Sequence, residues 1–403
     1  MVCRVLTTCR PFKRLYSFMN NHIDKAEAVL LEILKTEIGM QGCKKKHEVS
    51  LETLRQVMRL AKEHTVQGVV ANAAVTGRLT IADGPENGKG NGKGMAVMKL
   101  MQLTMIHKRN LNLFERTVGR FAHLMKEHNI AFVVFKGLAM ARLYPTPWMR
   151  TMGDVDFYVP KSCFDRAVEV IERELNVLIE KDDVDKHFAF DYEGIRFEMH
   201  YQIETFGNKR HQLFFNGLID ECVAKGTAAF AVNDADNQCI NINVLQPEED
   251  LVVVFKHWFN HLLVEGVGLR QTLDLAVLLQ AYDGKIDAAK LMKDVDMMGY
   301  KNAFKAMLAL MRKHFGVATA DSLCTIDARD ERYGDKLLEA VMESGNFGRK
   351  AYKAKSSGKK KSMETAQRAL AHCIKFFWLA PIDILCLIPK RIGISVKQKI
   401  NVV

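Results

Sequence analysis

Residues 154–159 of this chain, DVDFYV, constrain its fold more than any other segment because acidic and apolar residues alternate in them. This alternation is typical of a β-strand, and it places Asp154 and Asp156 on the same face, several ångströms apart. Two carboxylates that close repel each other unless cations neutralise them, and burying them beside valine and phenylalanine adds no stability. For this pair taken alone, an edge strand with both aspartates in solvent is the simpler interpretation.

Residues further along the chain favour a metal site. Glu198 lies between Phe197 and Met199 in a second expected strand, which could pair beside the first. Three carboxylates from two neighbouring strands could hold two magnesium ions, or manganese ions, around one phosphoryl group. His200 shares the face of Glu198, where it could bind substrate or assist proton transfer; an ordinary strand histidine is the alternative.

Cations precede the acidic segment. Lys136 and Gly137 end the apolar run 131–135 and open a short helix, where backbone NH groups and an ammonium group could receive a triphosphate. Arg150, which precedes Asp154 by four residues, could clamp a phosphate in bidentate fashion. The segment therefore combines cationic and acidic groups suited to a nucleoside triphosphate and its metal ions.

The periodicity of apolar residues divides the chain into a helical, an α/β and a second helical part. We expect an N-terminal helical region at 1–95 that ends in the Gly-rich linker 84–94, an α/β core at 96–245, and a C-terminal helical domain at 246–403 with a basic connector at 349–361 and an apolar tail. The fold class is α+β, with a small mixed sheet between helical regions.

Within these parts the pattern predicts individual elements. The helices are expected between 18 and 80 and at about 96–129, 138–144, 162–175, 248–263, 269–282, onward to about 315, and 335–345; the strands are expected at 131–135, 154–159 and, around a turn at Glu193–Gly194, within 188–203.

Composition excludes several classes of protein. With 48% hydrophobic and 26% charged residues, the chain is neither disordered nor a disulfide-stapled miniprotein. Its nine cysteines form no CxxC pair, which is typical of reduced thiols. No export signal or stretch of 18 apolar residues is visible, so a cytoplasmic location is expected.

The net charge of +11 favours a polyanionic partner without choosing among nucleotides, nucleic acid and anionic lipid. No RNA-recognition signature is present, and aromatic residues are not interleaved with basic ones. Residues 349–361 are typical of a solvated connector; together with the apolar segment FFWLAPIDILCLIPKR that follows, residues 349–391 could instead contact a membrane surface.

The order of the motifs resembles the nucleotidyltransferases of the DNA polymerase beta superfamily, and more narrowly a bacterial branch described as nucleotidyltransferase family proteins. The resemblance covers roughly residues 98 to 310. It is carried by KG at 136–137, LYP at 143–145, R-x-x-GDVD at 150–156, FEMH at 197–200, HWFNH at 257–261 and RQTLDL at 270–275.

This resemblance implies that Asp154 and Asp156 are the paired metal ligands and that Glu198 is the third carboxylate. It further implies a nucleotide-binding turn at Gly137, with Lys136 before it, and a nucleotide-binding set completed by Arg150 and Gly153. The chain differs from better-studied relatives in the 16 residues between Gly137 and Asp154, in the absence of a serine after Gly137, and in having Glu where an Asp is usual.

The expected activity is magnesium-dependent transfer of a nucleoside monophosphate from an NTP, such as ATP, to a hydroxyl of a small molecule, sugar or protein, with release of pyrophosphate. An inactive binding or scaffold protein on the same fold is the alternative.

Two further pairs of residues are weaker candidates. Arg270 and Asp274 are interpreted most simply as a helix-surface ion pair, and a role in contacting substrate is the alternative. His257 and His261 have the spacing of zinc ligands on a helix, but a structural or pocket-lining role is favoured because HWFNH lacks a glutamate.

Overall fold

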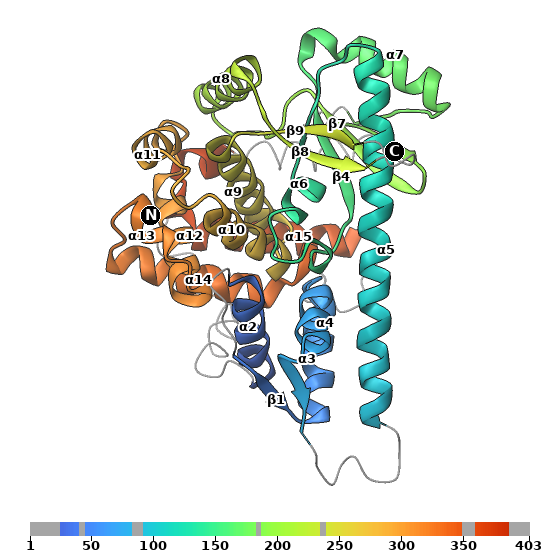
Figure 1. Cartoon of the computed structure of the whole chain (residues 1–403). Coiled ribbons are helices and arrows are strands. Elements are labelled where there is room, and N and C mark those ends of the chain that lie inside the picture. Colours follow the sequence, from blue (N-terminus) through green and yellow to red (C-terminus); the bar gives the residue numbers. More distant parts are fainter. Residues whose placement is uncertain are drawn as a thin grey trace, which may run out of the picture.

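The computed structural model describes residues 25–39, 45–82, 92–182, 187–233, 239–348 and 359–386. Within them a seven-stranded mixed sheet lies beside a large group of helices, which confirms the expected α+β class. Figure 1 shows the sheet at one end of the long helix α5 (Gly92–Glu127) and the first helices of the chain at its other end.

The N-terminal part is helical, as expected, but it also contains a short sheet. Its helices are α2 (Lys25–Ile38), α3 (Leu51–Glu63) and α4 (Gln67–Val75), and strands β1 (His47–Val49) and β2 (Leu79–Ile81) pair in parallel. Strands of three residues are too short to show an alternating pattern, so the sequence did not predict them.

Helix α5 connects the N-terminal helices to the sheet. It contacts α4 near its start and β8, β9 and α6 further along. The helix begins at Gly92, so the last residues of the predicted linker are helical, and residues 83–91 lie outside the described residues. Glycine is a poor helix former, which explains why the expected start was placed later.

The strand order of the sheet is β5-β6-β7-β4-β3-β9-β8. The strands are β3 (Val133–Phe135), β4 (Asp154–Tyr158), β5 (Glu180–Asp182), β6 (His187–Tyr192), β7 (Ile195–His200), β8 (Ala228–Asn233) and β9 (Cys239–Val244). Strand β4 pairs antiparallel with β3 and parallel with β7. The strands predicted at 131–135, 154–159 and 188–203 are confirmed, whereas β5, β8 and β9 were not predicted.

The two faces of the central strands differ in chemistry. On one face Phe157 and Phe197 are buried against Phe121 of α5, with ring centroids 5.0 Å from that ring in each case. Because side chains alternate along a strand, the opposite face of β4 and β7 carries Asp156 and Glu198. Aromatic packing on one side therefore fixes the position of the acidic side.

Short helices and the helix α8 link the strands. They are α6 (Gly137–Ala141), the 3₁₀ turns η3 (Pro147–Met149) and η4 (Lys161–Cys163), α7 (Phe164–Leu175) and α8 (Lys209–Lys225). The helix expected at 162–175 is confirmed, and α8 was not predicted.

Helices form the rest of the described chain. They are α9 (Pro247–Val264), α10 (Leu269–Ala281), α11 (Ala288–Met297), α12 (Lys301–Leu310), the π-helical turn η5 (Met311–Phe315), α13 (Thr319–Leu323), α14 (Ala328–Ser344), the 3₁₀ turn η6 (Asn346–Gly348), α15 (Lys359–Lys375) and the 3₁₀ turn η7 (Phe377–Leu379). Helix α15 begins inside the predicted basic connector, whose residues 349–358 lie outside the described residues. No helix in the described ranges has the length and apolar character needed to cross a membrane.

Asp250 on α9 has a buried carboxyl group that contacts Tyr282, the residue after α10. The Tyr282 hydroxyl donates a hydrogen bond to Oδ2 of Asp250 at 2.9 Å, and Oδ1 has no hydrogen-bond partner. Burial raises the pKa of Asp250 to about 7, against the lowering effect of the Tyr282 hydrogen bond. The folded chain therefore retains a proton on Asp250 at pH values where the unfolded chain has lost it.

We expect the free energy of unfolding to depend on pH through Asp250. Because the folded state binds the extra proton, this contribution falls as the pH rises from about 4 to about 8, by on the order of 1 to 4 kcal/mol. The amide of Asp250→Asn carries no charge at any pH, so this variant should lose that slope and be more stable than the unmodified chain at high pH. Urea denaturation across this range checks it, and parallel curves for the two proteins would refute it.

Candidate active site

The register of the two central parallel strands brings two acidic residues together. Asp156 on β4 is paired with Glu198 on β7, and Tyr158 is paired with His200 two residues further along. One ligand atom from each of Asp156, Glu198 and His200 lies within 4.8 Å of the other two. This group of two carboxylates and an imidazole could hold a metal ion, and the expected pairing of the two strands is confirmed.

Asp156 is buried and its charge is compensated by two cationic or hydrogen-bonding groups. The Lys136 ammonium lies 3.6 Å from Oδ1 of Asp156, and Nε2 of His200 lies 3.1 Å from the same oxygen. Burial alone would raise the pKa of Asp156, but Lys136 and His200 together lower it below its ordinary value. Asp156 is therefore held as a carboxylate.

Asp154 shares the face of Asp156 but has different surroundings. It is partly buried, and burial together with the neighbouring charge of Asp156 raises its pKa, although Lys136 and Arg270 act in the opposite direction. Asp154 does not belong to the group of ligand atoms formed by Asp156, Glu198 and His200. Its assignment as a metal ligand stays a prediction.

The turn from β3 into α6 has a backbone that few side chains tolerate. Lys136 has φ +55° and Gly137 has φ +30°. A Cβ atom added at Gly137 would lie 2.9 Å from the carbonyl oxygen of Asp154, so glycine is required for the turn to approach β4. A positive φ at a residue such as Lys136 is typical of functional sites, and its ammonium group lies 3.6 Å from Asp156.

Arg150 is paired with a carboxylate of the C-terminal helices. Its Nε and Nη2 donate to the two oxygens of Asp274 on α10, each at 2.9 Å, and the Tyr144 hydroxyl donates to the same carboxylate at 2.8 Å. All three residues are buried. The interpretation of Asp274 and Arg270 as a helix-surface ion pair is therefore wrong, because the carboxylate is inside the protein and binds Arg150.

Arg270 lies at the start of α10, beside the acidic segment. Its Nη1 donates to the carbonyl oxygen of Thr151 at 3.4 Å, and a Cβ added at Gly153 would lie 4.0 Å from that nitrogen. The Nε atom is buried and has no hydrogen-bond partner. Burial and the charge of Arg150 lower the pKa of Arg270 from its ordinary value. The guanidinium therefore lies next to Gly153 and keeps hydrogen-bonding capacity that the described residues do not use.

The N-terminal helices also contact this region. His64, which follows α3, accepts a hydrogen bond at Nδ1 from the Leu269 backbone NH and one at its carbonyl oxygen from the Arg270 backbone NH, both at 3.3 Å. The Thr151 hydroxyl donates to the carbonyl oxygen of Thr65 at 2.9 Å. The loop before β4 and the start of α10 are thus both attached to the α3–α4 connection.

The sequence did not predict one further acidic residue near the site. Glu204, which follows β7, accepts hydrogen bonds from His257 Nδ1 at 2.9 Å and from Asn260 Nδ2 at 2.8 Å, both on α9. Burial alone would raise the pKa of Glu204, but His257 and the nearby cations lower it to about 2. Burial and Lys136 lower the pKa of His257 to about 4. The HWFNH motif was the available signal. The hydrogen bond between His257 and Glu204 agrees with the structural half of the favoured structural or pocket-lining role, and the pocket-lining half stays a prediction.

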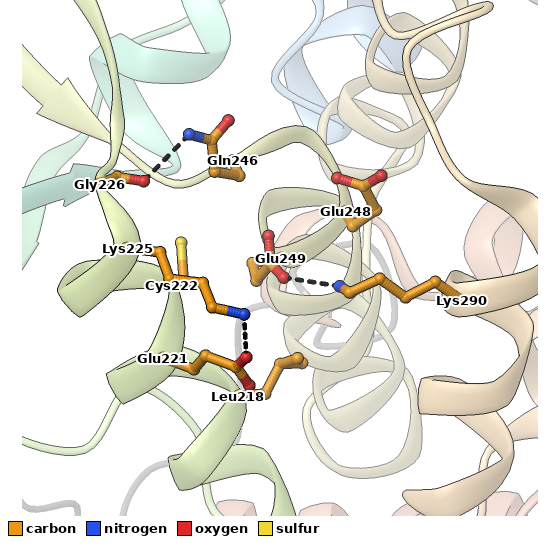
Figure 2. Close-up of a pocket in the computed structure, with 9 residues that line it drawn as sticks. All are labelled: Leu218, Glu221, Cys222, Lys225, Gly226, Gln246, Glu248, Glu249 and Lys290. Atoms are coloured by element: carbon orange, nitrogen blue, oxygen red, sulfur yellow. Dashed lines mark hydrogen bonds and ion pairs between the residues drawn. The ribbon is translucent and has the colours of Figure 1, made fainter.

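A pocket of about 280 Å³ lies between α8, the start of α9 and α11, and Figure 2 shows the residues that line it. Four of its five charged residues are paired, Glu221 with Lys225 and Glu249 with Lys290. None of the residues of the acidic group lines it. The lining consists of Leu218, Glu221, Cys222, Lys225, Gly226, Gln246, Glu248, Glu249 and Lys290.

Comparison with known proteins assigns the family. The chain belongs to the family described as "Uncharacterised nucleotidyltransferase", which matches residues 52–316, more than half of its length. The expected resemblance to nucleotidyltransferases is thus confirmed. The matched region begins in α3 and so includes the α3–α4 connection that contacts the site.

Similarity to solved structures is distant. An antigenic nucleotidyltransferase-like protein from Paracoccidioides brasiliensis is 12% identical with a TM-score of 0.31, over 50% of this chain and 92% of that one. A tRNA nucleotidyltransferase complexed with a primer tRNA and an incoming ATP analog is 13% identical with a TM-score of 0.21, over 70% of this chain and 99% of that one. No curated protein matches the chain.

We expect Asp274→Ala to destabilise the protein by about 3–5 kcal/mol, because it leaves the Arg150 guanidinium buried without its carboxylate. Urea denaturation measures the loss. Replacing both partners, in Arg150→Met with Asp274→Leu, should cost less because no buried charge is left unpaired.

The exposed pair of Lys301 and Asp296 serves as the control. Asp296→Ala should change stability by less than about 1 kcal/mol. An equally small effect of Asp274→Ala would contradict the structural role of the buried pair.

Proposed function

We propose that this chain is a metal-dependent nucleotidyltransferase that moves a nucleoside monophosphate from an NTP to a hydroxyl acceptor and releases pyrophosphate. The observation that carries the proposal is the pairing of Asp156 with Glu198 across two parallel strands, with cationic side chains around them. Membership of a nucleotidyltransferase family supports the reaction class. The same proposal takes ATP as the donor and a small molecule, sugar or protein as the acceptor. It also includes a bacterial source and a cytoplasmic location.

The residues present fit a divalent metal ion. Asp156, Glu198 and His200 supply two carboxylates and an imidazole within reach of one ion. Carboxylates suit magnesium and manganese, and an imidazole favours a transition metal, so manganese fits this set at least as well as magnesium. When bound, such an ion would neutralise phosphate charge and lower the pKa of an acceptor hydroxyl. Asp154, on the same face, would be available to a second ion.

The chain's own cations would bind the triphosphate. The Lys136 ammonium can leave the Asp156 carboxylate and bind a phosphate oxygen instead. The backbone of Gly137 is next to Lys136 in the turn. Arg270 has its Nη1 close to Gly153, and its buried Nε has no hydrogen-bond partner among the described residues. Arg150 is already paired with Asp274, so its contribution would come from Nη1, which has no hydrogen-bond partner.

The reaction itself is a substitution at the α-phosphorus. The acceptor oxygen forms a bond to this phosphorus, and the bond to the bridging oxygen breaks as pyrophosphate leaves. The proton of the acceptor hydroxyl passes to solvent or to a neighbouring base. Glu198 is the most exposed member of the acidic group, with 28% of its side chain accessible, so we assign it to the side from which the acceptor arrives.

A catalytically inactive nucleotide-binding or scaffold protein is the second candidate. It is favoured by the charge compensation already present, because Lys136 neutralises Asp156 and Asp274 neutralises Arg150 without any ligand. These ion pairs could be retained because they stabilise the fold, even in a protein that no longer turns over nucleotide. Nucleotide turnover distinguishes the two candidates.

The decisive experiment incubates the full chain with manganese or magnesium and each α-labelled NTP, with and without cell lysate. We expect labelled product and pyrophosphate, both lost by at least a hundredfold in Asp156→Asn and in Glu198→Gln because these side chains hold the metal ion. Metal-dependent thermal stabilisation by NTP, which follows from mass action, should weaken in the same variants.

Asp191→Asn is the matched control, since Asp191 is an exposed carboxylate on the neighbouring strand β6. It should retain full turnover. Turnover that persists in Asp156→Asn would reject the proposed chemistry, and NTP binding without turnover in the unmodified chain would favour the inactive candidate.

Arg270→Gln should weaken ATP binding about tenfold to a hundredfold, because it removes a charge-assisted hydrogen bond to phosphate. Adenosine, which has no phosphate, should bind the variant and the unmodified chain equally. Calorimetric titration gives both affinities. Arg312→Gln, which removes an arginine paired with Asp321 and Glu331, should change neither, and an unaltered ATP affinity in Arg270→Gln would exclude Arg270 from the phosphate site.

A further inference from the structure

The whole net charge of the chain resides in its C-terminal segment. Residues 349–403 contain 13 of the 58 lysines and arginines but 2 of the 47 aspartates and glutamates, which leaves 45 of each kind in the first 348 residues. The segment therefore carries a formal charge of +11, and the remainder is neutral. A charge concentrated in this way indicates an anionic partner for this segment rather than for the protein as a whole.

The same segment exposes a row of large apolar side chains. Leu370 and Ile374 on α15 are followed by Trp378, Ile382 and Leu385, and each is between 43% and 61% exposed. They lie in the last turns of α15, in the 3₁₀ turn η7 and in the helical residues 381–386. Phe377, 41% exposed, extends the row.

The opposite side of the segment is anchored in the protein. Phe376, Leu379 and Ile384 are buried in the same core as the C-terminal helices, and the His372 ring donates to the carbonyl oxygen of Leu262 at 2.6 Å. Packing of these buried residues therefore fixes the backbone that carries the exposed row. The segment is apolar both toward the core and toward solvent, and large apolar side chains gathered at the surface are typical of interaction sites.

We propose that this row, together with the positive charge that the sequence concentrates in residues 349–403, docks the protein on an anionic lipid surface. Aliphatic side chains gain free energy by entering the boundary of the acyl chains, while lysine and arginine are attracted to acidic headgroups. Nucleic acid fits less well because leucine and isoleucine offer no stacking surface to bases. The contact is interfacial, and it does not depend on the nucleotidyltransferase reaction.

Trp378 provides a direct probe of this contact. The guanidinium of Arg329 lies 3.6 Å from the centre of its ring, while Trp148 and Trp258 are buried. Insertion should shift the Trp378 emission to the blue and allow quenching by lipids with brominated acyl chains. Trp378→Phe should remove the signal and retain binding.

The experiment is sedimentation of the full chain with vesicles of phosphatidylcholine, with and without phosphatidylserine. We expect binding to the anionic vesicles, weakened at least tenfold when salt is raised from about 0.1 M to about 0.5 M. The variant Leu370→Ser, Ile374→Ser, Leu385→Ser should bind roughly tenfold or more weakly, since three apolar side chains no longer enter the lipid.

The matched control carries Met98→Ser, Met105→Ser and Ile106→Ser on α5, where the side chains are equally exposed. It should bind as the unmodified chain does, and both variants should keep the unfolding midpoint because neither touches the core. Several results would overturn the proposal: absent vesicle binding, equal binding by the apolar variant, preferential binding of an RNA oligonucleotide, or a dimer that the apolar variant converts to a monomer.

Discussion

Negative charge on one face of two adjacent parallel strands is the constraint around which the centre of this protein is arranged. The register of β4 and β7 places Asp156 beside Glu198, and buried carboxylates require compensation. That compensation comes from separate parts of the chain: Lys136 after β3 and His200 on β7 act on Asp156, and Lys136 and Arg270, at the start of α10, act on the neighbouring Asp154. The sheet and the C-terminal helices must therefore meet at this face.

The contacts that join the parts lie next to the acidic group. The pair of Arg150 and Asp274 attaches the loop before β4 to α10, and His64 attaches the start of α10 to the N-terminal helices. Because the family match begins at residue 52, helices α3 and α4 belong to the same family region as the site. Through the hydrogen bonds of His64 to Leu269 and Arg270, they hold the start of α10 in place.

Local sequence patterns predicted the strands on which the site depends. The partners of Asp274 and Glu204 are distant in the sequence, so local patterns did not predict them. Alternation in DVDFYV and in the segment around Glu198 predicted two strands that are confirmed, because both have one apolar face and one acidic face. Spacing on α10 suggested that Arg270 pairs with Asp274, yet a partner 124 residues away, Arg150, takes that carboxylate. Glu204 had no signal in its own segment, because its partners are in the HWFNH motif on α9.

The arrangement around Asp156 suits an exchange of cations more than permanent binding of one ion. Lys136 lies 3.6 Å from the carboxylate, close enough to compensate its charge and too far for a strong hydrogen bond. A dication entering beside Asp156 and Glu198 would displace this ammonium toward whatever anion accompanies the metal. Binding of the metal and of the triphosphate would then be mutually dependent, because the dication adds positive charge beside the carboxylates and the triphosphate neutralises it.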